Sequence, residues 1–330
     1  MSAVGLVLGG GGVTGAAYQT AALMALELAT GWKADSAEVV VGTSAGAFVA
    51  AMVRGGRLGL DSLVGDADTR EEVAEAIRGR IFTRRPGVRV GRWLRHGVLP
   101  GLRNPGLTLL LASPAPFVTD GIARWVRTEL GAVADGWPDA PTSIVAFDVE
   151  TRRRVAFGTV DAPDVPLADA VAASAAIPLL FRPYEIDGRL YVDGGVVSGT
   201  HADLVLGSPV PLDLVLVLAP MAVEEEREGS LFIERIFDRV GRTALADEVA
   251  MITDRWPHTD VVVLRPKPHV LEAMRPNPMD PMAAVPSFIR TLLSMRRTLA
   301  EPEVWEVLRR HLVAGSASRV TRPLGESGSG

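Results

Sequence analysis

The first candidate for chemistry is a serine between two glycines, in the segment Gly42-Thr43-Ser44-Ala45-Gly46. An apolar run at 39–41 precedes it and a run of small and apolar residues at 47–52 follows, which predicts a strand, a sharp turn and a helix. The glycines permit a turn tight enough to expose the Ser44 hydroxyl. Amides at the start of the helix, Ala45 first, would face any negative charge that forms there. The pattern is typical of a nucleophilic serine, although short matches of this kind also arise by chance.

A second candidate is the glycine-rich segment 9–15, which follows a predicted strand. Gly10, Gly11 and Gly12 have no Cβ, so their amides can approach an oxyanion closely. The same segment matches the glycine spacing of a dinucleotide-binding loop. That loop is normally followed by an acidic residue at the end of the second strand, but here the second strand leads into the turn around Ser44. We prefer an oxyanion loop; a dinucleotide- or anion-binding loop and a simple tight turn are the alternatives.

A carboxylate follows another predicted strand, in Asp193-Gly194-Gly195 after the run 190–192. Functional side chains collect at strand ends in α/β sheets, so Asp193 is a candidate base for Ser44. A free aspartate has a pKa of about 3.9, which is low for a base, and a dry apolar setting would raise it. A Ser-His-Asp triad through His201 is the rival arrangement.

Taken together, the glycine loop, the serine turn and the Asp-Gly-Gly segment resemble the patatin-like phospholipase family. The resemblance implies a three-layer α/β/α fold with a central, mostly parallel sheet. It also implies a serine lipid acyl hydrolase of the phospholipase A or esterase type, in which Ser44 and Asp193 act as a dyad through an acyl-enzyme. The oxyanion hole that it implies is formed by Gly10, Gly11, Gly12 and Ala45. A catalytically degenerate lipid-binding module is a further alternative.

The chain departs from the family pattern at two places. Thr14 stands where the family usually has Arg or Lys, which removes a local positive charge but leaves the backbone donors. The segment 196–199 lacks the asparagine pair expected after the Asp-Gly-Gly motif.

Composition narrows the chemistry further. The 330 residues include no cysteine, which excludes disulfides, zinc–thiolate sites and cysteine nucleophiles. The five histidines show no metal-binding spacing, so we expect neither a metal nor a cofactor. No run of 18 uninterrupted apolar residues predicts a membrane span, and the apolar N-terminus has no basic residue before it and is broken by glycines, unlike a signal peptide. A cytoplasmic protein, in peripheral contact with a membrane at most, is expected.

Strand and helix signals alternate along the chain, which predicts a sheet covered on both faces. We expect one hydrolase domain at 1–314, interrupted by a helical and loop insertion at about 57–141, and a disordered tail at 315–330. Asp187-Gly188 predicts a type I′ hairpin turn. Long helices are predicted at 231–256 and 287–312.

Charge is unevenly distributed. The net charge is −5, yet the segment between Ala76 and Thr119 holds eight arginines and no acidic residue. Arginine mixed with Trp and Leu is typical of a surface that contacts anionic lipid. The residues predicted to contact such a membrane are Arg84, Arg85, Arg89, Arg92 and Trp93. The alternative is pairing with acidic surface such as 224–226. At this net charge, no nucleic-acid partner is expected.

Overall fold

The computed structural model describes residues 2–59, 65, 67–85, 115–222 and 232–313. Within α10, side chains are described only from Ala244 on. Three predictions therefore lie outside the described residues: the contacts of Arg89, Arg92 and Trp93, the acidic run 224–226, and the tail 315–330.

A single eight-stranded sheet forms the centre of the fold, with the strand order β10-β9-β1-β2-β5-β8-β7 and β6 paired with β5. Five strands are mutually parallel: β1 (Val4–Leu8), β2 (Val39–Thr43), β5 (Thr142–Asp148), β9 (Leu214–Leu218) and β10 (Asp260–Leu264). Three further strands extend the sheet beyond β5 through antiparallel pairing: β6 (Arg153–Phe157), β7 (Tyr184–Ile186) and β8 (Arg189–Asp193). The predicted mostly parallel sheet is confirmed.

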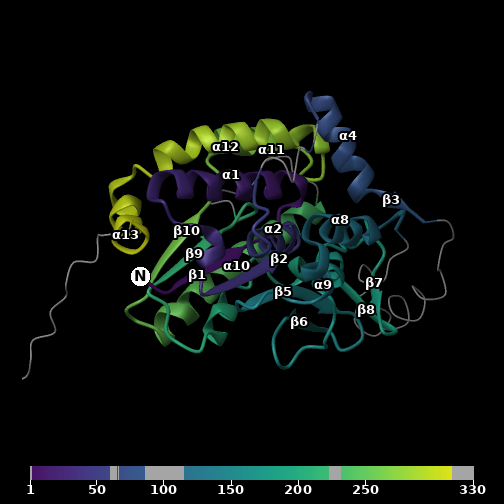
Figure 1. Ribbon diagram of the computed structural model, residues 1–330, viewed down its shortest axis with the longest axis horizontal. Helices are drawn as coiled ribbons and strands as arrows, with labels where there is room; N and C mark the ends of the chain where they lie inside the picture. Colours follow the sequence, from purple (N-terminus) through teal and green to yellow (C-terminus); the bar gives the residue numbers. More distant parts are fainter. Residues whose placement is uncertain (1, 60–64, 66, 86–114, 223–231, 314–330) are drawn as a thin grey trace, which may run out of the picture.

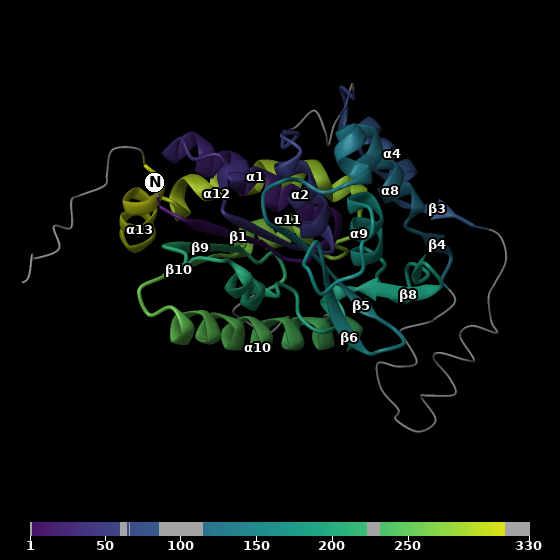
Figure 2. The same cartoon turned by 60° about the horizontal axis from the view of Figure 1, so that its bottom comes forward.

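Helices cover both faces of this sheet, which gives three layers (Figures 1 and 2). The helices of the first layer are α1 (Gly12–Thr30), α2 (Ala45–Arg54), α4 (Arg70–Ile81), α8 (Asp120–Leu130), α9 (Leu167–Ser174), α11 (Pro268–Met274) and α12 (Ala284–Thr298). On the opposite face lies α10 (Phe232–Arg255), as Figure 2 shows. The last helix is α13 (Pro302–Leu312).

The strand sequences explain why both faces are covered. In β1, Leu6 and Leu8 belong to the core under α1 and α2, whereas Val7 between them belongs to the core under α10. Because successive side chains of a strand point to opposite faces, a strand that is apolar throughout must be buried on both sides. All five residues of β1 are buried.

Local predictions agree with the structure except near the C-terminus. The Asp187-Gly188 turn has φ angles of 49° and 80°, as a type I′ turn requires. The single helix predicted at 287–312 is wrong, because α12 ends at Thr298 and α13 starts at Pro302. Proline has no amide hydrogen and is favoured in the first turn of a helix, so Pro302 starts a new helix instead of continuing the old one.

The predicted insertion contains α4, α8 and a two-stranded sheet of β3 (Thr83–Arg84) and β4 (Phe117–Val118). Both helices pack against the main core. The boundaries of the domain and of the insertion stay predictions. In the part of the chain that the structure describes, no helix has the combined length and apolarity that a bilayer span requires.

Candidate active site

The sheet register brings the two candidate catalytic residues to one place. β2 runs parallel to β5 and its last residue, Thr43, pairs with Val145. β8 runs antiparallel to β5 and its last residue, Asp193, pairs with Ala146. β2 and β8 thus lie on opposite sides of β5, run in opposite directions and end beside neighbouring residues of β5. This places Ser44, directly after Thr43, near Asp193.

Ser44 sits on a strained turn. Its backbone has φ 56° and ψ −119°, a conformation that side-chain-bearing residues rarely adopt. The turn is packed against β1: a Cβ added to Gly46 would lie 1.9 Å from the Leu8 carbonyl oxygen. A Cβ on Gly42 would lie 2.7 Å from the Gly46 carbonyl oxygen. Both glycines are thus required by the close approach of the backbone.

Asp193 is buried and has a shifted pKa. The residue is 4% exposed, and burial is the main cause that raises the pKa of its carboxyl to about 6. Hydrogen bonds from the Ser44 hydroxyl and from the Gly195 amide, the latter 2.7 Å from Oδ1, oppose this rise. The carboxylate is therefore a better proton acceptor than a free aspartate, and its hydrogen-bonding partner is the candidate nucleophile.

The segment 173–178 also resembles the patatin-like family in sequence, but sequence reasoning gave Ser174 no role, and the structure shows that this segment holds both residues in place. Ser174, the last residue of α9, accepts a hydrogen bond from the Ser44 amide at 2.8 Å and donates one to the Val145 carbonyl at 2.6 Å. Two residues further on, the Ala176 carbonyl accepts from the Asp193 amide at 3.0 Å. A buried polar residue at the end of a small-residue helix was the available signal, but its partners are distant in sequence.

The glycine loop lies beside Ser44, but one of its amides already has an acceptor. The Gly10 amide donates to the Gly199 carbonyl at 2.7 Å, so it is not free to bind an oxyanion. The predicted role of Gly10 as a donor therefore needs correction: Gly10 packs near the Ser44 side chain instead, where an added Cβ would lie 3.4 Å from the Ser44 Cβ. Within the described part of the chain, the amides of Gly11, Gly12 and Ala45 have no acceptor.

An apolar pocket of about 290 Å³ opens above Ser44. Apart from Ser44, its described lining is entirely apolar or aromatic, and it comes chiefly from α1, α2, α4, α8 and α12. The largest lining side chains are Phe48, Trp125, Phe181, Met279 and Phe288. Such a pocket suits a hydrocarbon chain, since each buried methylene contributes about 0.8 kcal/mol.

His201 does not have the geometry of a triad histidine. Its Nε2 lies 3.1 Å from the Gly194 carbonyl oxygen and its Nδ1 lies 3.4 Å from Arg154 Nη1. A carbonyl can only accept, so Nε2 carries the proton and Nδ1 is left to accept from Arg154. Burial lowers the pKa of His201 to about 4, so the ring is neutral at pH 7. Both ring nitrogens thus have partners other than Ser44 and Asp193.

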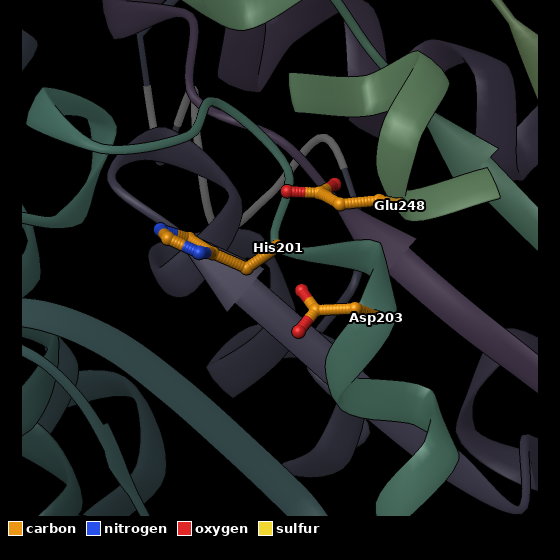
Figure 3. Close-up of side chains that lie close together, drawn as sticks. All are labelled: His201, Asp203 and Glu248. Atoms are coloured by element: carbon orange, nitrogen blue, oxygen red, sulfur yellow. The ribbon is translucent and has the colours of Figure 1, made fainter. Parts of the chain in front are cut away.

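His201 also belongs to a cluster with Asp203 and Glu248, in which one nitrogen or oxygen atom of each side chain lies within 4.8 Å of those of the other two (Figure 3). These residue types can bind metals, but their oxygens are already engaged by protein donors. Arg154 donates to both Asp203 oxygens, at 2.8 and 2.5 Å, so the positive charge beside this carboxylate is that of the guanidinium. Glu248 accepts three hydrogen bonds. The cluster therefore has the character of a closed polar network.

Two of the predicted membrane-contact residues are described. Arg84 lies over the ring of Phe117, 5.6 Å from its centroid. Arg85 is 65% exposed and forms an ion pair with Asp120 at 3.7 Å. Exposed pairs of this kind are weak, so Arg85 is available to other anions.

Comparison with known proteins identifies the family. A family model described as patatin-like phospholipase matches residues 6–206 of the 330. Uncharacterized NTE family proteins of Mycobacterium bovis and Mycobacterium tuberculosis are each 36% identical in an alignment of 89 residues, and the match covers 24% of this chain and 23% of theirs. The match thus spans about a quarter of those relatives. The crystal structure of VipD from Legionella pneumophila aligns with a TM-score of 0.37 at 12% identity, over 94% of this chain and 67% of that one. Because the family model matches more than half of the sequence, the chain belongs to the patatin-like phospholipase family, which implies a hydrolase acting on lipids.

Proposed function

We propose that this protein is a serine lipid acyl hydrolase that cleaves fatty-acyl esters with Ser44 and Asp193. The observation that carries the proposal is the meeting of a strained serine hydroxyl and a buried carboxylate at the facing ends of β2 and β8. The apolar pocket above Ser44 supports an acyl substrate.

The reaction follows from this geometry in two halves. Ser44 Oγ forms a bond to the ester carbonyl carbon while its proton passes to Asp193, and the amides of Gly11, Gly12 and Ala45 stabilise the oxyanion. Collapse breaks the ester bond, and the proton on Asp193 goes to the leaving alkoxide. Water then attacks the acyl-enzyme, Asp193 takes the water proton, and Ser44 recovers it as the fatty acid leaves.

Ser44→Ala tests the proposal directly. We expect hydrolysis of a p-nitrophenyl fatty-acyl ester to fall by at least about a thousandfold, as with other serine nucleophiles. A fluorophosphonate should label the wild type at Ser44 and leave the variant unlabelled. Ser36→Ala, which removes an exposed hydroxyl far from the pocket, is the matched control and should behave as wild type. Equal turnover by Ser44→Ala and wild type would overturn the proposal.

The same assays separate the alternatives. A dinucleotide- or anion-binding protein that uses the glycine loop has no activated serine, so it would not be labelled. A degenerate lipid-binding module would bind a fatty acid without any turnover. The hydrogen bond between Ser44 and a carboxylate of raised pKa favours the hydrolase over both.

We further propose that Arg84, Arg85, Arg89, Arg92 and Trp93 contact anionic lipid and make the enzyme peripheral to a membrane. The support is the run of eight arginines without an acidic residue and the exposure of Arg85. The cytoplasmic location expected from the sequence stays a prediction.

The double variant Arg89→Gln/Arg92→Gln measures this contact. Each arginine near an anionic surface contributes about 1 kcal/mol, so binding to phosphatidylserine vesicles should fall roughly thirtyfold. Turnover of a soluble ester should not change. The control is Arg152→Gln/Arg153→Gln, an equal change of charge at an exposed hairpin. Vesicle binding that falls equally in both double variants would contradict a specific contact.

A further inference from the structure

A short loop at 198–202 contacts both halves of the candidate active site. On one side, the Gly199 carbonyl accepts the Gly10 amide at 2.7 Å. The fit is close, since a Cβ on Gly9 would lie 3.0 Å from the Gly199 carbonyl oxygen and 3.1 Å from Thr200 Cγ2. On the other side, His201 Nε2 donates to the carbonyl of Gly194, the residue after Asp193. The conformation of this loop therefore sets where the glycine loop lies relative to Asp193.

One carboxylate from the opposite helix layer holds this loop. Glu248 of α10 accepts hydrogen bonds from the Ser198 hydroxyl at 2.5 Å, the Thr200 hydroxyl at 2.6 Å and the Ala202 amide at 2.8 Å. Figure 3 shows the Glu248 carboxylate pointing from the helix towards the loop that carries His201. Glu248, Ser198 and Thr200 are all buried. Three donors on one buried carboxylate make a strong, directional attachment.

Ser198 connects the Glu248 carboxylate to the backbone of the loop by further hydrogen bonds. Its hydroxyl oxygen accepts from the amides of Thr200 and His201, both at 3.2 Å, while the hydroxyl hydrogen goes to Glu248. Ser198 thus folds the turn, and Glu248 fixes the orientation of Ser198. The asparagine pair that the family pattern leads one to expect is missing from this segment. A serine oriented by a glutamate supplies the turn here.

We propose that Glu248 is a positioning residue that holds the 198–202 loop, and through it the oxyanion amides of the glycine loop, in register with Ser44 and Asp193. The assignment rests on the proposed hydrolase function. It concerns a residue beyond 6–206, the part of the chain that the family model matches.

The proposal predicts an effect on turnover and not on substrate binding. The pocket is lined mainly by α1, α2, α4, α8 and α12, and no residue of the 198–202 loop belongs to its described lining. The oxyanion donors act on charge that develops in the transition state, so a small displacement lowers kcat. Replacing a residue that contributes only to stability would lower the amount of folded enzyme, but the folded fraction would keep the wild-type kcat.

The test compares Glu248→Ala, Glu248→Gln and Thr200→Val with a control, Thr259→Val. The control removes another buried hydrogen bond, from Thr259 to the Leu212 carbonyl at 2.6 Å, outside the loop. With a soluble fatty-acyl ester, we expect kcat of Glu248→Ala to fall at least tenfold with KM within twofold of wild type. Glu248→Gln, which keeps one acceptor, should recover part of the loss, and Thr200→Val should lose about threefold. Thr259→Val should lower the Tm and leave kcat unchanged.

The outcomes separate the claims. Wild-type kcat in a folded Glu248→Ala variant would overturn the assignment, and so would an equal fall of kcat in Thr259→Val. If Glu248→Ala does not fold, Thr200→Val decides: its expected loss of kcat at unchanged KM supports the assignment, and wild-type kcat refutes it. Activity that survives in Ser44→Ala would overturn the proposed function itself, and the positioning role with it.

Discussion

If Asp193 is the proposed base, replacing it by asparagine should remove nearly all ester hydrolysis and, at neutral pH, make the protein more stable than the wild type. The amide has nearly the shape of the carboxyl, so its oxygen can still accept from the Gly195 amide. It cannot accept the Ser44 proton, so the first half of the reaction has no base. We expect a loss of at least about a thousandfold in kcat, as when a catalytic group acting in concert with the nucleophile is removed.

The gain in stability follows from the raised pKa. Burial raises the pKa of Asp193 from its ordinary value of 3.8 to about 6, so between these pH values the folded state holds a proton that the unfolded state has lost. Folding stability of the wild type therefore falls as pH rises through this window, and above about pH 6 the buried charge costs about 3 kcal/mol. Asparagine carries no such charge at any pH.

Denaturant unfolding at several pH values measures the difference. Asp193→Asn and wild type should be equally stable near pH 3, below both pKa values. The stability advantage of the variant should grow between about pH 4 and 6 and stay constant at higher pH. The wild-type pH–rate profile should fall as pH drops below about 6, because the base becomes protonated. A gap that is equally large at pH 4 and pH 8 would mean that the charge of Asp193 is not its cause.

Asp148 provides the matched control for this experiment. It is as buried as Asp193 but is paired with Arg189 at 2.6 Å and accepts the amides of Glu150 and Thr151. Asp148→Asn removes a charge that has these partners, so it should destabilise the protein at neutral pH. Opposite signs in the two variants would show that the environment of each carboxylate, and not the substitution, decides the effect.

Sequence reasoning succeeded where the signal is local. The turn around Ser44 and the Asp187-Gly188 hairpin are each specified by a few adjacent residues, because glycine permits backbone conformations that other residues avoid. The apolar strands β1 and β2 follow directly from their composition. These elements suffice to identify the sheet and the candidate nucleophile.

What the sequence could not supply depends on contacts between distant segments. The meeting of Ser44 and Asp193 needs the register of two strands on β5, and that register is not encoded in either motif. The loss of Gly10 as a free donor depends on the Gly199 carbonyl, almost two hundred residues away. Ser174 likewise acts through hydrogen bonds to remote backbone atoms.

Gly46→Ala, which adds one methyl group, should be among the glycine-to-alanine substitutions that most reduce stability and activity in this protein. The new methyl would meet backbone on two sides, 1.9 Å from the Leu8 carbonyl oxygen and 2.8 Å from the Gly9 carbonyl oxygen. Neither is the end of a flexible side chain, so the start of α2 must move away from β1 and the glycine loop. Overpacking of this kind costs about 1–3 kcal/mol or more.

The same movement separates the parts of the active site. Ser44 and Ala45 travel with α2, whereas Gly11 and Gly12 stay with β1 and α1. A misplacement of about 1 Å can cost roughly a hundredfold in rate, so we expect kcat/KM on a soluble ester to fall by at least that factor in whatever protein remains folded.

Gly79→Ala, in the last turn of α4, is the control for this prediction. An added Cβ at Gly79 meets nothing within 4 Å among the described residues, so the substitution is sterically free. Alanine favours a helix over glycine by about 0.5–1 kcal/mol, so this variant should gain stability and keep wild-type turnover. The same chemical change would then have opposite effects at two helical glycines. If Gly46→Ala proved as active as Gly79→Ala, the close contact of α2 with β1 would not be needed to align Ser44 with the oxyanion amides.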